Sequence, residues 1–438
     1  MRKTQILIVF ILLFSMFFAF DALAVEQEDV DLSKVENVYV YNIENDKVLY
    51  SKNSSDRVYP ASTVKVMTGV IALEHYKGDY SKKVMVTKDS LGGYKGKSIQ
   101  LKSGEEVTVE NLLYAVICGG YNDAANVLAY EIAGSHDKFV EMMNEKAKEL
   151  GMNNTNYANA YGYSDTNMYS TAEDTAILAK YAYNINDYMK MANTVRYVMD
   201  STNKAKTRYV YNCNYLIATN VETKYKNAEV MGMSAGSTVE GGHVLVTTVI
   251  RNGMTNIYVL MGAQYDDENI YSYIASKELI NWSYENFGYR KIVDKSEMVC
   301  EIEVKLSSQV DYVVLLPDQT IEVYLPTSVD IQKDIERKIE LYDKKPEAPL
   351  RAGHIAGEMT LIYEGEEIGK VNLITKNNVD RNGFLYILAR IETLTKSSKF
   401  KIAIWVIVIV LILYGLMIIY RRSRFSRQKY KYNRYRRK

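Results

Sequence analysis

One segment near the C-terminus limits most strongly what this chain can fold into. Residues 402–420 form a run of 19 residues without a charged side chain, close to the roughly 20 that a helix needs to cross about 30 Å of hydrocarbon. Residues 421–438 then contain ten Lys or Arg and no acidic residue, a bias typical of the cytoplasmic side. We therefore predict a single-pass cell-membrane protein, with a transmembrane helix over 402–420, a basic cytoplasmic tail over 421–438 and an extracytoplasmic body.

The N-terminus also indicates export. Residues 1–24 place two basic residues before an apolar run and end in Ala-Leu-Ala. This order of basic, apolar and small residues is typical of a secretory signal peptide. We predict a signal peptide over 1–24 with cleavage after Ala24.

Composition excludes several classes of function. Residues 25–400 contain 41 basic and 52 acidic residues, a net charge of −11, which argues against nucleic acid as a partner. The three cysteines, Cys118, Cys213 and Cys300, are too few and too scattered for a disulfide scaffold. The four histidines and three cysteines show no zinc-binding spacing. We expect chemistry without a metal or a cofactor.

Helical and strand-like patterns alternate in the first two thirds of the chain. Residues 62–75 and 172–183 have helical patterns, and Ser135 and Gly151 have the positions of an N-cap and a C-terminal stop around another helix. Strand-like apolar runs follow from about residue 228, and a long helix closes this part. We predict an α/β domain over residues 25–290.

The remaining exported residues show a different pattern. Short β runs alternate with turn residues between about residue 291 and residue 385. We predict a small all-β domain over 291–385 and a linker over 386–401 that leads into the membrane.

A serine and a lysine three residues apart indicate a possible catalytic pair. The segment "YPASTVKVMT" (59–68) contains Ser62 and Lys65 at the start of an apolar periodic run. Residues i and i+3 share one face of a helix, and Pro60 suits a helix start. Lys65 can accept a proton from Ser62 only when it is neutral, which requires burial or neighbouring cations to lower its pKa.

Further segments resemble a known family in the expected order. They are "NLLYAVICGGYNDAANVLA", "GMSAGSTVEGGHVLVTT" and a C-terminal stretch over 346–381. Together with "YPASTVKVMT", they resemble the serine D-alanyl-D-alanine carboxypeptidases, the low-molecular-mass penicillin-binding proteins of bacterial walls. The resemblance covers roughly residues 35–381. It implies an α/β domain like that of serine β-lactamases and penicillin-binding proteins, followed by an all-β domain.

The resemblance also implies a function and a set of site residues. Ser62 would attack the carbonyl between the last two D-alanines of a peptidoglycan stem peptide, with Lys65 as general base and Asn122 from the second motif. An acyl-enzyme would form and be hydrolysed, and β-lactams would be possible covalent ligands. The backbone N–H groups of Ser62 and Ser237 would bind the oxyanion.

Two family motifs are incomplete in this sequence. The second motif, Ser-x-Asn, falls at residues 120–122, where Gly120 replaces the serine that helps to pass the proton. The third motif, Lys-Thr-Gly, falls at Ser234, Ala235 and Gly236, which lack the lysine and hydroxyl that bind the terminal carboxylate. We therefore expect weaker recognition of the carboxylate and, without that lysine, a higher pKa for Lys65.

Other residues offer partial substitutes, each with a structural alternative. His243 could supply a partial cation or be an ordinary sheet residue, and Cys118 could be a reactive thiol or a buried packing residue. Tyr121 could line the cleft or cap a loop, and Ser234 could donate one neutral hydrogen bond to a carboxylate.

The sequence therefore favours a carboxypeptidase, with one alternative left open. That alternative is a catalytically weak or inactive module that binds wall peptides or a partner. A β-lactamase shares the Ser/Lys chemistry, but the membrane anchor and the second domain argue against it.

Overall fold

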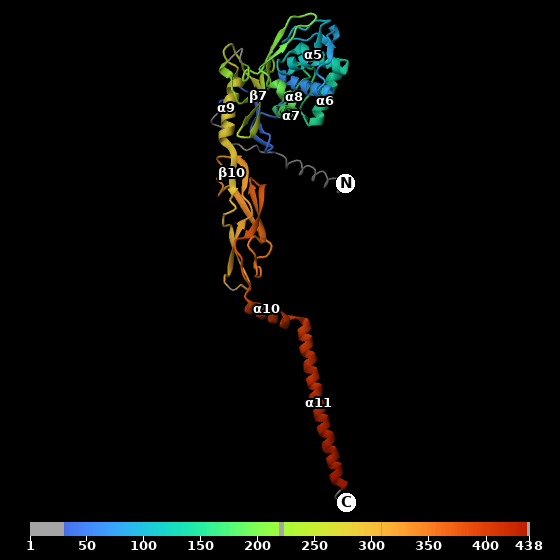
Figure 1. Cartoon of the computed structure of the whole chain (residues 1–438), viewed down its shortest axis with the longest axis vertical. Coiled ribbons are helices and arrows are strands. Elements are labelled where there is room, and N and C mark those ends of the chain that lie inside the picture. Colours follow the sequence, from blue (N-terminus) through green and yellow to red (C-terminus); the bar gives the residue numbers. More distant parts are fainter. Residues whose placement is uncertain (1–29, 219–222, 308, 436–438) are drawn as a thin grey trace, which may run out of the picture. The chain divides into compact units, whose positions relative to one another are not determined.

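The computed structural model describes residues 30–218, 223–307 and 309–435, so the predicted signal peptide lies outside the described residues. The chain divides into two compact units (Figure 1). The first reaches Gly288 and includes Tyr324–Ser328, and the second contains Tyr289–Val323 and the chain from Val329 onward.

A five-stranded antiparallel sheet forms the centre of the first unit. Its strands lie in the order β2-β1-β9-β8-β7. They are β1 (Asn37–Asn42), β2 (Lys47–Lys52), β7 (Val230–Thr238), β8 (Gly242–Arg251) and β9 (Met254–Ala263). Two short ribbons accompany the sheet, β3 (Lys83–Met85) with β4 (Glu106–Thr108) and β5 (Arg196–Met199) with β6 (Arg208–Tyr211).

Helices cover both faces of this sheet. They are η1 (Ala61–Thr63), α2 (Val64–Tyr76), α3 (Lys88–Leu91), α4 (Val109–Ile117), α5 (Asn122–Ala133), α6 (His136–Leu150), α7 (Ala172–Tyr183), α8 (Asn186–Ala192), η2 (Thr223–Tyr225) and α9 (Tyr271–Asn286). Ser135 caps α6 by accepting a hydrogen bond from the Lys138 N–H, and the left-handed Gly151 ends it.

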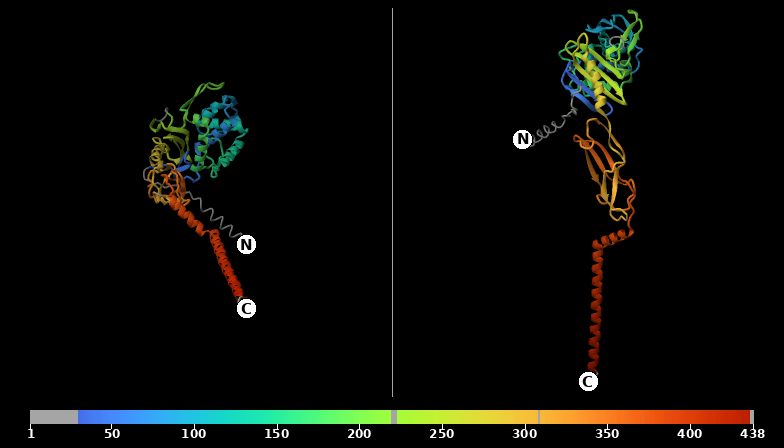
Figure 2. Two further views of the ribbon diagram at one scale, coloured as in Figure 1. Left: turned by 60° about the horizontal axis from the view of Figure 1, so that its bottom comes forward. Right: turned by 90° about the vertical axis from the view of Figure 1, so that its left-hand side faces the viewer.

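Alternation along the strands explains the three layers. In β8, Val244 and Val246 pack into the core that contains α2, α4 and α5, whereas Leu245 faces the core formed with α9. Figure 2 shows α9 lying across the strands, and Figure 1 shows α5 to α8 grouped together. The buried strands β8 and β9 therefore need apolar residues on both faces.

The second unit contains a five-stranded antiparallel sheet in the order β11-β12-β16-β15-β14. Its strands are β11 (Cys300–Glu303), β12 (Tyr312–Pro317), β14 (Ile335–Leu341), β15 (Ile355–Tyr363) and β16 (Glu366–Thr375). Two further strands, β10 (Phe287–Val293) and β13 (Ile321–Pro326), contribute residues to both units. The predicted fold class, an α/β domain followed by an all-β domain, is confirmed.

The C-terminal region differs from the predicted linker. Most of 386–401 belongs to helix α10 (Gly383–Lys396), which begins where Asn382 accepts hydrogen bonds from two backbone N–H groups. Apolar residues recur along α10 at 384, 387, 388, 391 and 394, and each side chain is exposed. Such helical spacing produces one apolar face, which the predicted linker did not include.

Helix α11 (Ser398–Tyr435) contains the predicted transmembrane segment. Its portion Ser398–Ser423 is long and apolar enough to cross a membrane. The helix continues as far as Tyr435. The predicted basic tail therefore begins as a continuation of the apolar helix.

Candidate active site

Ser62 lies in the turn that leads into helix α2. This turn, η1, has Ala61 in the left-handed region at φ +44°, a conformation that costs a non-glycine residue about 1 to 3 kcal/mol. The hydroxyl of Thr63 donates to the Pro60 carbonyl oxygen at 2.7 Å. Ser62 itself is 9% exposed, so the turn holds its hydroxyl in a water-poor environment.

Lys65 lies in the first turn of α2 and is buried. Its ammonium group donates to the Tyr161 carbonyl oxygen at 2.6 Å. Burial lowers the pKa of Lys65 to about 7; the neighbouring Cys213 opposes this change, and the charge of Lys97 adds to it. About half of the amine is therefore neutral at pH 7, although the third-motif lysine is absent.

The two side chains do not form a hydrogen bond with each other. The hydroxyl oxygen of Ser62 has no hydrogen-bond partner among the described residues, while Lys65 is engaged by the Tyr161 carbonyl. Catalytic hydrogen bonds are often poorly aligned in free enzymes and tighten when substrate binds. The structure thus places a buried hydroxyl and a buried amine at the start of the same helix, without a hydrogen bond between them.

The loop that engages Lys65 is held by a single asparagine. The side-chain oxygen of Asn159 accepts hydrogen bonds from the backbone N–H groups of Tyr161, Gly162 and Tyr163 at 2.8 to 3.3 Å. A Cβ atom added to Gly162 would lie only 1.8 Å from the Ala61 carbonyl oxygen. This loop therefore packs directly against the turn that carries Ser62.

Strand β7 approaches the nucleophile from another side. A Cβ atom on Gly236 would lie 2.9 Å from the Ser62 hydroxyl oxygen, so only glycine permits this approach. The Ser234 hydroxyl donates to the backbone carbonyl of Ser62 at 3.0 Å and is buried. Ser237 follows on the same strand; it is exposed, and its strand partner in β8 is His243. The Ser234 hydroxyl is thus already hydrogen-bonded within the protein.

Asn122 supports the loop that carries Lys97. Its side-chain N–H donates to the Lys95 carbonyl at 2.6 Å, and its backbone N–H donates to the Lys97 carbonyl at 2.8 Å. The Lys97 ammonium group donates to the Gly119 carbonyl at 2.7 Å and lies over the ring of Tyr121. Lys97 could not be predicted from local sequence patterns, because its contacts are more than twenty residues away along the chain.

The structure indicates the roles of two residues that were proposed as substitutes for the missing motif groups. His243 is buried, shares a 2.7 Å hydrogen bond with Ser272, and has its pKa lowered to about 4 by burial, so it is a neutral sheet residue at pH 7. Cys118 is fully buried and its thiol donates to the Thr194 carbonyl, while burial raises its pKa. It is therefore a packing residue.

Tyr121 precedes the first residue of α5, where it occupies the N-cap position without a side-chain capping bond. Its half-buried ring lies beneath the Lys97 ammonium group, with 4.8 Å between the nitrogen and the ring centre. Tyr121 therefore lies in the loop at the start of α5, and a role in lining a cleft stays a prediction.

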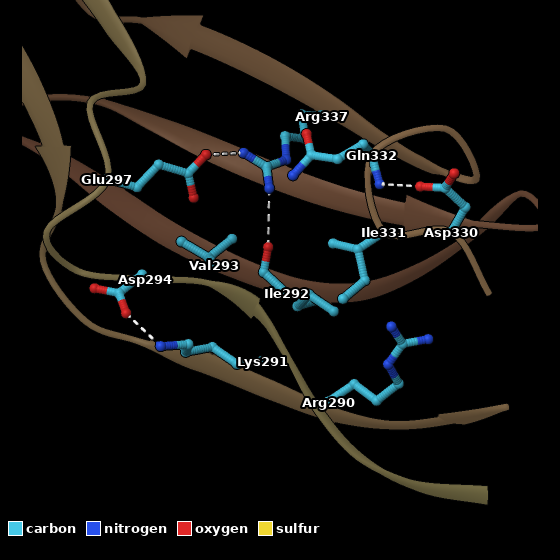
Figure 3. Close-up of a pocket in the computed structure, with 10 residues that line it drawn as sticks. All are labelled: Arg290, Lys291, Ile292, Val293, Asp294, Glu297, Asp330, Ile331, Gln332 and Arg337. Carbon is cyan, nitrogen blue, oxygen red and sulfur yellow. Dashed lines mark hydrogen bonds and ion pairs between the residues drawn. The ribbon is translucent and has the colours of Figure 1, made fainter. Parts of the chain in front are cut away.

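The second unit contains a separate pocket of about 460 Å³ (Figure 3). Its basic residues already have partners: Arg337 forms an ion pair with Glu297 and donates to the Ile292 carbonyl, and Lys291 pairs with Asp294 at 2.6 Å. These charges are not free to bind an anion. Within the described ranges, no group of three or more His, Cys, Asp or Glu side chains could hold a metal ion.

Comparisons with known proteins identify the family of this chain. The family model of D-alanyl-D-alanine carboxypeptidases matches residues 25–265, and that of the C-terminal domain of penicillin-binding protein 5 matches residues 287–381. D-alanyl-D-alanine carboxypeptidase DacF of Bacillus subtilis (strain 168) is 30% identical over 359 residues, which cover 81% of this chain and 88% of the relative. DacA of Haemophilus influenzae is 28% identical over 390 residues, covering 84% and 93%.

Solved structures give the same result. The crystal structure of penicillin binding protein 5 from Haemophilus influenzae has a TM-score of 0.55 and 27% sequence identity. The match covers 80% of this chain and 98% of that protein. Because both parts of the chain match in this way, the chain belongs to the D-alanyl-D-alanine carboxypeptidase family, the low-molecular-mass penicillin-binding proteins.

Proposed function

We propose that this chain is a membrane-anchored serine carboxypeptidase that removes the terminal D-alanine from peptidoglycan stem peptides. The observation that carries the proposal is the buried amine of Lys65, located one helical turn after Ser62. Its pKa of about 7 leaves a substantial neutral fraction at physiological pH. A buried lysine with a lowered pKa is the form that can act as a general base.

The reaction uses Ser62 as a covalent nucleophile. Its hydroxyl oxygen attacks the carbonyl carbon of the penultimate D-alanine while its proton passes to the neutral amine of Lys65. The C–N bond breaks, the proton is transferred to the leaving nitrogen, and an ester on Ser62 remains. Water then attacks the ester; one of its protons passes through Lys65 and restores the Ser62 hydroxyl. The backbone N–H groups of Ser62 and Ser237 stabilise the oxyanion.

Substrate recognition is weakened in this chain. The side chain of Ser234 donates to the Ser62 carbonyl instead of facing a ligand, and Ala235 has no hydroxyl. Each missing hydrogen bond to a charged carboxylate costs about 1.5 to 3 kcal/mol. We therefore expect a high KM for stem peptides with a free terminal carboxylate.

The second candidate function is a binding module with little or no turnover. It is favoured by the buried hydroxyl of Ser62, which has no hydrogen-bond partner within the described part of the chain. The engagement of Lys65 by the Tyr161 carbonyl points the same way. Such a module would bind wall peptides or a partner in the same cleft.

The proposed location follows from the C-terminal helix. The apolar segment Ser398–Ser423 would cross the membrane once, and the basic residues after it favour a cytoplasmic C-terminus. The first unit would then face the cell wall, where its substrate lies. The apolar residues of α10 would contact the same membrane surface.

A covalent label tests the proposed acyl transfer. The full chain, solubilised in detergent, is incubated with a fluorescent penicillin and the modified residue is mapped by mass spectrometry. We expect one adduct on Ser62, absent in Ser62→Ala, and release of D-alanine from a pentapeptide. An adduct without D-alanine release would indicate slow acylation by a binding module, and no adduct would contradict the proposal.

Replacing Lys97 with methionine tests the source of the neutral base. Loss of this cation removes a contribution that lowers the pKa of Lys65, so the pKa rises and less neutral amine is present at pH 7. For each unit of rise, the neutral fraction in the acidic range falls about tenfold. We expect the rate of penicillin acylation, measured from pH 5.5 to pH 9.5, to shift to more alkaline pH.

Lys95→Met is the matched control for this change. Lys95 lies two residues away, is exposed, and its ammonium group lies over the ring of Tyr163. Lys95→Met should leave the pH profile of acylation unchanged. The same profile in Lys97→Met and the wild type would show that Lys97 does not influence the base.

A further inference from the structure

The proposed acyl transfer requires a carrier for one proton. The proton that Lys65 takes from Ser62 must reach the nitrogen of the leaving D-alanine. The Tyr161 carbonyl, which contacts Lys65, can only accept hydrogen bonds, and Lys97 carries only donors. Gly120 has no side chain. A group that both accepts and donates a proton is needed near these residues.

Cys213 lies beside the position that a side chain at residue 120 would occupy. A Cβ atom added to Gly120 would lie 3.4 Å from the Cβ atom of Cys213 and 3.7 Å from its sulfur atom. The Cys213 side chain is half-buried and is not part of a disulfide. It also interacts electrostatically with Lys65, where it raises the pKa of the amine. The thiol therefore lies next to Gly120 and interacts electrostatically with the base.

The segment around Cys213 is fixed by its neighbours. The side chain of Asn212 donates to two backbone carbonyls at 2.7 and 2.9 Å, and Asn214 accepts from a backbone N–H at 3.0 Å. The backbone N–H of Cys213 donates to the Cys118 carbonyl at 2.8 Å, and the Tyr273 hydroxyl donates to the Cys213 carbonyl. Side chains held in this way keep a constant position for chemistry.

The nucleophile provides an independent observation. Ser62 is 9% exposed and its hydroxyl oxygen has no hydrogen-bond partner in the described structure. Leaving a buried hydroxyl unpaired is unfavourable. The free state therefore leaves a hydrogen-bonding position at Ser62 that a bound group can fill.

We propose that the Cys213 thiol transfers the proton from Lys65 to the leaving nitrogen of the substrate, in the space next to Gly120. This inference rests on the proposed acyl transfer and adds one catalytic residue to it. The thiol donates its S–H proton to the leaving nitrogen as the C–N bond breaks, and it receives a proton from the Lys65 ammonium group. Cys213 is therefore a neutral thiol again at the end of each acylation.

Two variants of Cys213 separate proton transfer from packing. In Cys213→Ala we expect acylation by fluorescent penicillin to slow about a hundredfold, the low end of what positioned proton transfer contributes. In Cys213→Ser the hydroxyl can both accept and donate, so the rate should stay within about threefold of the wild type. Cys118→Ala, which removes a buried thiol on the neighbouring segment, is the matched control and should change the rate less than threefold.

Alkylation gives a second measurement in the unmodified chain. N-ethylmaleimide should react with Cys213, and prior acylation by penicillin should reduce that reaction at least about fivefold because the adduct fills the same space. Cys300, in the second unit, provides an internal reference whose alkylation should not change. Peptide mapping by mass spectrometry distinguishes the two sites even if Cys213→Ala fails to fold.

Three outcomes would overturn the inference. Equal rates in the wild type and a folded Cys213→Ala would show that the thiol transfers no proton. Equal slowing in the alanine and serine variants would show that Cys213 is a packing residue. Alkylation of Cys213 at a rate that penicillin does not change would show the same. If the wild-type chain forms no adduct, the proposed acyl transfer fails first and this inference fails with it, whereas the outcomes above leave the acyl transfer intact.

Discussion

At pH 7, Lys65→Met is expected to slow acylation by about a hundredfold to ten thousandfold while making the folded protein more stable. The rate falls because the general base is removed, and general bases typically contribute this factor. The stability rises because methionine buries no amine in the site where Lys65 is 6% exposed. Opposite changes in activity and stability are expected where a fold accepts an unfavourable group for its chemistry.

The sign of the stability change follows from proton binding. Burial lowers the pKa of Lys65 from 10.5 to about 7, so between these values the unfolded chain binds more protons than the folded chain. The stability of the wild type therefore rises with pH from about 7 to about 10.5. The difference of about 3.5 units corresponds to about 5 kcal/mol at low pH and about 4 kcal/mol at pH 7.

The expected gain in Lys65→Met is smaller than this limit. Methionine leaves the Tyr161 carbonyl without the Lys65 hydrogen bond, which costs about 1 kcal/mol. We expect a net gain of about 3 kcal/mol at pH 7 that shrinks as the pH approaches 10.5. Thermal unfolding of the detergent-solubilised chain at pH 7, 9 and 10.5 measures it.

Lys95→Met is the control for the stability measurement. Lys95 is exposed and is not among the groups that shift the pKa of Lys65, and surface substitutions usually change stability by less than about 0.5 kcal/mol. A Lys65→Met variant that is less stable than the wild type at every pH would show that the lysine is not held as a desolvated amine. Its slow acylation would then have to be attributed to damage to the fold.

Local patterns in the sequence were sufficient to predict the fold class. Ser135 and Gly151 mark the two ends of α6 because capping depends on residues within one turn of each end. The nearly continuous run of buried residues in β8 follows from its two buried faces. The amphipathic spacing in α10 was also local, and it was overlooked because a linker was expected there.

The contacts within the candidate site could not be predicted from local patterns. The Tyr161 carbonyl lies next to Lys65 although the two residues are 96 positions apart, and Ser234 donates to a residue 172 positions away. Cys213 and Gly120 meet through a loop that no periodic pattern describes. Such pairs depend on how the helices and strands pack, so a cysteine or lysine far from the motifs gives no signal in one sequence.

Gly162→Ala is expected to have a large effect because the loop at Gly162 packs against the turn that carries Ser62. An added Cβ atom would lie 1.8 Å from the carbonyl oxygen of Ala61 and 2.6 Å from its carbonyl carbon. Both atoms belong to the backbone, so no side-chain rotation relieves the overlap. Gly162 also has φ +76°, a conformation that costs other residues about 1 to 2 kcal/mol.

The clash should affect both stability and chemistry. We expect a loss of about 3 kcal/mol or more, as for overpacking combined with backbone strain. The loop must move away from Ala61, and a shift of about 1 Å at a reacting group costs about a hundredfold in rate. Acylation of Ser62 by fluorescent penicillin should therefore slow at least about a hundredfold, even at temperatures where the variant is folded.

Gly134→Ala separates the clash from the backbone conformation. Gly134 has φ +75°, nearly that of Gly162, but a Cβ atom added there would meet no described atom within 4 Å. This variant should lose only the cost of the left-handed conformation, about 1 to 2 kcal/mol, and should acylate at the wild-type rate. Equal effects in both variants would mean that the loop at Gly162 does not press on the nucleophile turn, and that Ser62 is positioned by α2 and β7 alone.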